Sequence, residues 1–141
     1  MKKKIAILGS TGSIGKSLIK ILNDHKKNYE IVLLSADKNY KLLLKQAIKL
    51  KAKNIIINND KALSLIKKNK KIRSIKIYKN FSSFNLIFKK KVDYVMSSIS
   101  GLNGLEPTLK IIKHTKKIAI ANKESIICAW PIIKKELKKN S

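Results

Sequence analysis

Short apolar runs alternate along this chain with longer stretches in which apolar residues recur every three or four positions. The short runs are rich in isoleucine and valine and apolar on both faces, as buried parallel strands are. They predict strands at Lys4–Leu8, Ile31–Ser35, Asn54–Ile57, Ser74–Tyr78, Val92–Ser97 and Lys117–Ala121. The stretches between them predict helices at Ser13–Asn23, Tyr40–Lys51, Asp60–Lys68, Phe81–Phe88, Asn103–His114 and Pro131–Lys139. Such alternation predicts βαβ units, a parallel sheet and right-handed crossovers.

The pattern also indicates how individual helices begin and which sides they bury. In the first predicted helix, Ile14, Leu18, Ile21 and Leu22 share one side. Asn59 or Asp60 is suited to cap the third helix, and Pro131 is suited to the first position of the last one.

A glycine-rich segment, GSTGSIG at residues 9–15, joins the first predicted strand to the first predicted helix. Gly9 permits a tight turn, Gly12 lets backbone approach a pyrophosphate, and Gly15 lets the helix pack close to the sheet. Ser10, Thr11 and Ser13 add hydroxyl groups for phosphate oxygens. The context predicts a Rossmann-like α/β fold, doubly wound, with a mostly parallel sheet and helices on both faces. An ordinary glycine-rich βα turn is the alternative.

Length and composition narrow the class of protein. The 141 residues predict one dinucleotide-binding domain over residues 1–141, with no stretch long enough to span a membrane. The apolar run behind Lys2–Lys4 is too short for a signal peptide. A single cysteine, Cys128, excludes an internal disulfide and fits a reducing compartment. We expect a cytoplasmic protein.

The formal charge of +25 raises the question of nucleic-acid binding. Surfaces built for nucleic acids usually include arginine, whose planar fork binds phosphates and bases bidentately. Here all but one of the 33 basic residues are lysines spread along the chain, the exception being Arg73. We interpret the charge as a solvated surface with no specific nucleic-acid partner, and a functional basic face stays open as an alternative.

Polar residues follow three further predicted strands, where ligands of doubly wound sheets bind. After the second, Asp37 suits a free ribose 2′-hydroxyl and Lys38 a 2′-phosphate, so the residues leave NAD or NADP open, and Asp37 could instead cap a helix. Ser97–Gly104 follows the fifth strand and suits a nicotinamide ring, or is a flexible turn. Asn122–Ser125 follows the sixth and predicts polar side chains in the same cleft, or a helix start capped by Asn122.

Other candidate groups are interpreted as structural. His25 and His114 lie near lysine-rich helix ends, and we expect both at the surface. Cys128 and Trp130 are expected to pack in the interior rather than to carry chemistry.

Taken in order, GSTGSIG at residues 9–15, SADKN at 35–39, SGLNGLEPTL at 100–109 and ANKES at 121–125 resemble the amino-terminal domain of 1-deoxy-D-xylulose 5-phosphate reductoisomerases. The resemblance covers essentially the whole chain. It implies an NADPH-dependent oxidoreductase of non-mevalonate isoprenoid biosynthesis. Enzymes of that family convert 1-deoxy-D-xylulose 5-phosphate to 2-C-methyl-D-erythritol 4-phosphate with Mg or Mn, as homodimers.

The resemblance also implies roles for residues. Thr11, Gly12, Ser13 and Ile14 would contact the pyrophosphate and adenosine side of NADPH, Lys38 and Asn39 its 2′-phosphate, and Asn122 and Glu124 its nicotinamide side. With the turn residues, the predicted cofactor-binding set is Gly9, Ser10, Thr11, Gly12, Ser13, Ile14, Lys38, Asn39, Asn122 and Glu124. Lys123 would contact the substrate.

Two departures from the family pattern change the expectation. Asp37 stands where the family commonly has glycine, and its carboxylate would repel a 2′-phosphate unless Lys38 compensates. The family's acidic element with metal and substrate ligands has no counterpart before Ser141, and Asp93 and Glu106 do not replace it. We therefore predict a fragment with no catalytic or metal-binding residue, which binds NADPH without turnover unless a separate downstream polypeptide completes it.

Two other functions are weighed against this one. An NAD-binding domain of the sugar-epimerase type would suit Asp37 but needs a Tyr-x-x-x-Lys pair, and no tyrosine here has a lysine four residues on. A lysine-rich nucleic-acid-binding module would show a steep loss of affinity with salt and no preference for nicotinamide nucleotides.

Overall fold

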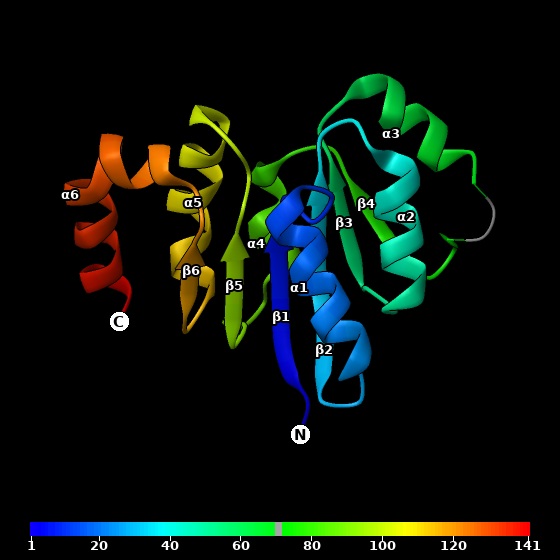
Figure 1. Cartoon of the computed structure of the whole chain (residues 1–141), viewed down its shortest axis with the longest axis horizontal. Helices are drawn as coiled ribbons and strands as arrows, with labels where there is room; N and C mark the ends of the chain where they lie inside the picture. Colours follow the sequence, from blue (N-terminus) through cyan, green and yellow to red (C-terminus); the bar gives the residue numbers. More distant parts are fainter. Residues whose placement is uncertain (70–71) are drawn as a thin grey trace.

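Figure 1 shows the protein as a computed structural model, which describes residues 1–69 and 72–141. Within them the strands are β1 (Lys3–Leu8), β2 (Tyr29–Ala36), β3 (Asn54–Ile57), β4 (Lys76–Tyr78), β5 (Tyr94–Ser97) and β6 (Ile118–Ile120). The α-helices are α1 (Ser13–Asp24), α2 (Tyr40–Lys49), α3 (Asp60–Lys67), α4 (Phe84–Ile87), α5 (Leu105–Ile111) and α6 (Lys123–Asn140). Short 3-10 turns cover Phe81–Ser83, Leu102–Gly104 and Ile112–His114.

The described strands form one sheet in the order β4-β3-β2-β1-β5-β6, and every neighbouring pair is parallel. Along the chain the strands run outward from β1 to β4, and the chain then returns to place β5 on the other side of β1. The direction of winding therefore reverses between β1 and β5. A reversal of this kind leaves a crevice at the carboxyl ends of the two strands, where doubly wound sheets bind ligands.

Two apolar layers sandwich the sheet, as the predicted fold class requires (Figure 1). On one face, α1, α2 and α3 bury a core that includes Leu22, Leu43 and Ile66. On the other face, α4 and α5 cover a second core that includes Phe84 and Ile111. The strands contribute alternate residues to the two cores, which explains why they are apolar on both faces.

Helix α6 differs from its prediction, because it begins at Lys123 rather than at Pro131. Ala129 interrupts it with φ −140° and ψ 20°, so two helical segments meet at a kink just before Pro131. Proline has no amide hydrogen and its ring collides with the preceding turn, which accounts for a break at this place. Asn122 caps the first segment and accepts a hydrogen bond from the Ser125 amide.

The buried side of α1 also differs in part from its prediction. Gly15 and Leu22 are buried, and Leu18 and Ile19 pack against the same core, so these positions form the contact side. Ile14 and Ile21 are 43% and 57% exposed. The contact side of α1 is therefore rotated by about one residue from the predicted side. The reason is that α1 comes nearest to the sheet at Gly15, which has no side chain, and not at a large apolar residue.

Three further expectations about burial are wrong. His114 is buried, with its ring stacked on Phe88 at a centroid distance of 5.2 Å. Cys128 is exposed and Trp130 is 45% exposed. Helix α6 packs through Ala129 at its kink and through Ile133, and neither Cys128 nor Trp130 belongs to that core. His25 is exposed, as predicted.

Candidate functional site

Two clefts open at the carboxyl edge of the sheet, on either side of the loop that follows β5. The larger, of 460 Å³, is lined by residues at the ends of β1, β2 and β5, among them Thr11, Asp37 and Ser98. The smaller, of 240 Å³, lies between the start of α1 and the start of α6. Residues 98–100 border both clefts. The arrangement suits one elongated ligand that passes the reversal of the sheet.

The glycine-rich turn between β1 and α1 depends on close backbone approach. Gly9 has φ +80°, and a β-carbon there would lie 2.9 Å from the backbone of Ser98. A β-carbon on Gly15 would overlap the carbonyl group of Gly9. Gly12, by contrast, has only ordinary contacts in reach and is exposed to the solvent side of the turn. The geometry thus agrees with the predicted roles of Gly9 in a tight turn and of Gly15 in close packing of the helix.

The start of α1 faces the clefts without a side-chain cap. Gly12 occupies the N-cap, and no side chain of the described residues accepts a hydrogen bond from the first turn. The first turn carries no acidic residue either, so the partial positive charge of this helix end is uncompensated. Ser13 and Ile14 of this turn line the smaller cleft, and Thr11 and Gly12 line the larger. Such an end attracts an anion such as a phosphate.

The prediction that Ser10 offers its hydroxyl to phosphate is wrong. Ser10 is fully buried, and its Oγ donates to Gln46 Oε1 at 2.8 Å. Its backbone amide donates to the carbonyl oxygen of Ser35 at 2.9 Å. These bonds are needed because Ser10 is buried against β2 and α2, where water cannot reach an unpaired polar group. Ser10 supports the turn from beneath.

At the end of β2, Asp37 lines the larger cleft together with Asn58, which follows β3. Asp37 does not cap α2, because Asn39 does so by accepting a hydrogen bond from the Leu42 amide at 3.2 Å. Lys38 and Asn39 are exposed beside Asp37 but are outside the residues that line either cleft. Of these two residues, Lys38 has the longer side chain, and Asn39 uses its side-chain oxygen for the cap of α2.

At the smaller cleft, Lys123 and Glu124 lie opposite Ser13 and Ile14, as the strand-end argument predicted. Asn122 behaves differently, because it is only 3% exposed. Its amide nitrogen donates to the carbonyl oxygens of Ile99 and Gly101, the latter at 2.6 Å. The side chain therefore ties the loop after β5 to the start of α6 and shapes the wall of the cleft.

Two residues that line the larger cleft, Phe81 and Asn58, were missed by the sequence reasoning. Ser98 belongs to the predicted loop after β5, and it closes the turn by donating to the Leu8 carbonyl oxygen at 2.8 Å. Asn58 could have been found, because it directly follows a predicted strand. Phe81 could not, because it reaches the cleft from a segment between β4 and α4 whose position depends on the tertiary packing.

No metal centre is evident among residues 1–69 and 72–141. Those residues contain no group of three histidine, cysteine, aspartate or glutamate side chains near enough to share an ion. Glu106 lines the larger cleft but pairs with Lys110. Asp93 pairs with Lys116 at 2.7 Å, and this hydrogen bond lowers the pKa of its carboxyl group, with a smaller effect from the Lys4 amide. Neither carboxylate belongs to a ligand cluster.

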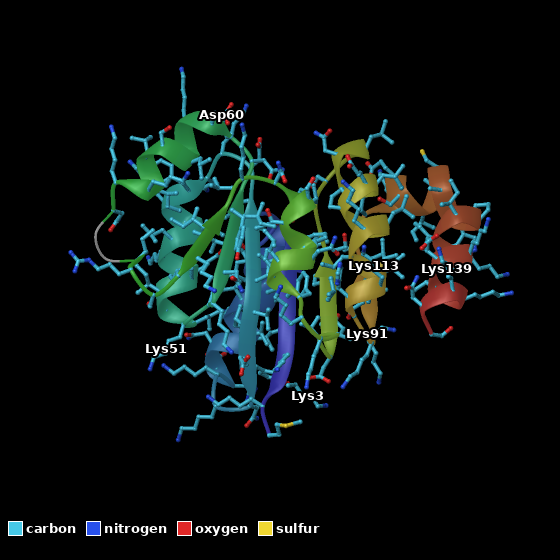
Figure 2. The ribbon with its side chains drawn as sticks, turned by 180° about the vertical axis from the view of Figure 1, so that it is seen from behind. Lys3, Lys51, Asp60, Lys91, Lys113 and Lys139 are labelled. Atoms are coloured by element: carbon cyan, nitrogen blue, oxygen red, sulfur yellow. The ribbon has the colours of Figure 1, made fainter. Side chains whose placement is uncertain are left out.

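A lysine-lined hollow of 330 Å³ lies at the opposite edge of the sheet. It includes Lys2, Lys26, Lys27, Lys49 and Lys51 around Tyr29. Figure 2 shows Lys3 and Lys51 along this lower edge, far from Asp60 at the upper one. Ligands of doubly wound sheets bind at the carboxyl ends of strands, so this hollow is not assigned to the cofactor.

In the described part of the chain, no helix has the length and apolar character needed to cross a membrane.

Comparisons with known proteins agree with this geometry. The family model described as 1-deoxy-D-xylulose 5-phosphate reductoisomerase matches residues 5–130. The enzyme of that name from Pelagibacter ubique is 55% identical over 139 residues, which are 97% of this chain and 36% of the relative. The solved reductoisomerase from Zymomonas mobilis in complex with NADPH superposes with a TM-score of 0.90 at 26% identity, covering 99% of this chain and 37% of that one. A reductoisomerase solved with NADPH, fosmidomycin and magnesium gives a TM-score of 0.87 at 29% identity, covering 98% and 34%. The chain thus spans about a third of the length of these relatives.

Proposed function

The chain belongs to the 1-deoxy-D-xylulose 5-phosphate reductoisomerase family, and from this premise we propose that it binds NADPH as the nucleotide-binding domain, residues 1–141, of such an enzyme. The observation that carries the proposal is the uncapped start of α1 at the reversal of the sheet, between the two clefts. The solved relative from Zymomonas mobilis was determined with NADPH, which supports the same ligand here.

The diphosphate of NADPH is proposed to lie over the glycine-rich turn. There the backbone of Gly9 and Gly12 allows close approach, and Thr11, Ser13 and Ile14 supply amide or hydroxyl donors around the helix end. The positive end of α1 then partly neutralises the diphosphate, which enters the site without its full hydration shell. Ser10 is left out of the contact set because its donors are used inside the fold.

The adenosine end is proposed to occupy the larger cleft. Phe81 offers an aromatic surface for the adenine ring, and Asp37 faces the ribose. Lys38 is the neighbouring cation that can reach a 2′-phosphate, with Asn39 beside it at the start of α2. The competition between Asp37 and Lys38 then sets the preference for NADPH over NADH.

The nicotinamide end is proposed to occupy the smaller cleft, beside Glu124 and the loop that Asn122 holds. When bound, NADPH supplies the hydride for a reduction. Lys123, exposed at the same cleft, is proposed to contact the substrate, where an ammonium group can hold a phosphate or polarise a carbonyl oxygen. The loop at residues 98–100 shields one side of the ring from water.

The described residues do not fit the Mg or Mn ion of the family, since no ligand cluster occurs among them. We therefore propose no metal-dependent step for these 141 residues, and we expect a polypeptide of this sequence to bind NADPH without converting 1-deoxy-D-xylulose 5-phosphate. Turnover would require metal and substrate ligands from elsewhere, such as a separate polypeptide. We also propose that the protein is cytoplasmic and that the enzyme to which this domain belongs is a homodimer.

Titration of the purified protein with NADPH, followed by the fluorescence of the reduced nicotinamide, tests the proposal. We expect a saturable signal, and competition by 2′,5′-ADP that removes it. A flat titration up to millimolar cofactor would contradict nucleotide binding. A parallel series with a duplex oligonucleotide across salt concentrations distinguishes the lysine-driven alternative, because that binding would weaken steeply with salt while NADPH had no effect on it.

A further inference from the structure

Gln46 is a polar residue in the apolar side of α2. Its side chain is 5% exposed, and its neighbours on that side, Leu43 and Ala47, are completely buried. Burying a carboxamide in apolar surroundings is costly unless all its polar atoms find partners. The partners of Gln46 therefore indicate why a glutamine occupies this position.

Both ends of the Gln46 amide engage Ser10, which is 36 positions away in the sequence. The oxygen Oε1 accepts a hydrogen bond from Ser10 Oγ at 2.8 Å, and the nitrogen Nε2 donates to the Ser10 carbonyl oxygen at 2.9 Å. The Ser10 amide donates to the Ser35 carbonyl oxygen at 2.9 Å. Ser10 is thus held by β2 and by α2 at once.

We propose that Gln46 is a positioning residue, which fixes the glycine-rich turn in the place where the start of α1 can receive the diphosphate of NADPH. This inference rests on the proposed function. Ser10 directly precedes Thr11 and Gly12, which line the larger cleft, so a shift of Ser10 moves the donors that face the ligand.

Helix α2 extends the effect to the other end of the adenosine site. Asn39 caps this helix beside Lys38, and Gln46 lies seven residues further on, about 10 Å along the helix axis. The same rigid element therefore carries the residues proposed for the 2′-phosphate and the amide that holds the diphosphate turn. Gln46 sets the distance between the two phosphate-binding places.

The arrangement differs from ordinary core packing. An apolar side chain of similar shape would fill the same space without the need for exact partners, and would satisfy the packing of α2 equally well. It would leave the Ser10 carbonyl oxygen without its side-chain donor and allow the turn to move. Groups that bind a ligand must be held within about 0.5 Å of their productive geometry, so movement of the turn weakens binding.

The test uses the variants Gln46→Met, Ser10→Ala and their combination, with Ile66→Val as control. Ile66 is fully buried in the core shared with α2 but lies outside the clefts, so its shortening lowers stability without touching the turn. Each variant is checked by circular dichroism and its Tm, and the Kd for NADPH is measured by fluorescence. Exchange of the Ser10 amide hydrogen is followed by NMR in the absence of cofactor.

We expect Gln46→Met to weaken NADPH binding about tenfold relative to Ile66→Val and to speed exchange of the Ser10 amide, because an unpaired buried group and a mobile turn result. Ser10→Ala should have a smaller effect, since the bond from Nε2 to the carbonyl oxygen remains. The combined variant should bind no more weakly than Gln46→Met alone. Should Gln46→Met fail to fold, Ser10→Ala is compared with Ile66→Val in its place, with the same two measurements and the smaller expected effect.

An NADPH affinity of Gln46→Met within twofold of the Ile66→Val control, or losses that multiply in the combined variant, would overturn the inference while leaving the proposed function intact. Unchanged exchange of the Ser10 amide would overturn it as well. Lack of NADPH binding by the unmodified protein would overturn the proposed function, and the inference with it.

Discussion

A β-carbon on Gly15 would lie 2.6 Å from the Cα atom of Ser10, a separation that real side chains do not tolerate. The contact joins the first turn of α1 to the glycine-rich turn beneath it. Because both partners are backbone, neither can rotate away. Gly15 therefore decides how closely α1 approaches the sheet, and thereby where the start of the helix points.

The variant Gly15→Ala should lower the free energy of unfolding by about 2 kcal/mol, the cost of overpacking at a rigid contact. Displacement of α1 should also weaken NADPH binding strongly. Urea denaturation and the fluorescence titration measure the two effects.

Gly12→Ala provides the matched comparison within the same turn. A β-carbon there would lie 3.5 Å from the Gly9 carbonyl oxygen, an ordinary contact, so we expect a loss of stability below about 1 kcal/mol. The added methyl group would stand where the diphosphate approaches, and NADPH affinity should fall about tenfold. Equal affinities of Gly12→Ala and the unmodified protein would place the diphosphate elsewhere.

Asn122→Asp separates the two tasks of this side chain. The aspartate keeps an oxygen for the Ser125 amide but loses the nitrogen that donates to Ile99 and Gly101. We expect a loss of about 1–3 kcal/mol in stability, because two carbonyl oxygens lose a buried donor. The loop after β5 should then move, and NADPH affinity should fall more than 2′,5′-ADP affinity, because both of the lost hydrogen bonds hold the wall beside the smaller cleft.

The control for this change is Asn80→Asp. Asn80 caps a turn by accepting from the Ser82 amide at 3.0 Å, a role that aspartate retains. Its stability and its affinity for both nucleotides should match those of the unmodified protein. A parallel loss of NADPH and 2′,5′-ADP binding by Asn122→Asp would show a general effect on the fold instead.

Asp37→Ser should shift the choice between NADPH and NADH. Removal of the exposed carboxylate relieves its repulsion of a 2′-phosphate, so NADPH affinity should rise several-fold, and the gain should shrink at high salt. NADH should bind more weakly, since its ribose hydroxyl loses an acceptor. The ratio of the two Kd values at low and high salt measures the change.

Asp24→Asn serves as the charge control for Asp37→Ser. Asp24 is exposed at the end of α1, away from the clefts, and its neutralisation changes the net charge equally. It should leave the ratio of the two Kd values unchanged. If both variants altered the ratio alike, the effect would come from total charge and not from the position of Asp37.

His114 makes stability depend on pH. Burial lowers the pKa of its imidazole below the usual value, with a smaller contribution from Lys113. The folded state therefore binds fewer protons than the unfolded state, whose pKa is about 6.5. The contribution of His114 to stability is complete above that pKa and is lost as the pH falls below it.

Urea denaturation between about pH 7.5 and about pH 5, an interval that spans the ordinary histidine pKa of about 6.5, measures this effect. The unmodified protein should lose stability across this interval. His114→Phe keeps an aromatic ring beside Phe88 and should have a flatter profile. Parallel profiles for the two proteins would contradict a role of His114.

Lys51 directly follows the C-cap of α2 with φ 53°, in the left-handed region. Glycine adopts this conformation without the cost of a β-carbon, so Lys51→Gly should raise the free energy of unfolding by about 0.5–1 kcal/mol. Lys49→Gly, inside the helix, should lower it by about 1 kcal/mol. Denaturation curves of the two variants check the opposite signs.

The sequence alone predicts the order of the elements and the place of the site. Strand runs, helical spacing and the GSTGSIG turn depend on neighbours within a few positions, and these local preferences are readable in one dimension. The family resemblance follows from the same short segments, and the matched relatives confirm it. Parallel pairing then brings Gly9–Gly15, Asp37 and Asn122–Ser125 to one edge, as expected from the strand ends.

What only the tertiary structure decided is how single side chains are used within that frame. Ser10 could serve a phosphate or the core, and only the arrival of Gln46 from α2 assigns it to the core. His114 is buried because α4 places Phe88 against it. Such choices depend on residues far apart in the sequence, since the desolvation of a polar group is set by whatever packs against it in space.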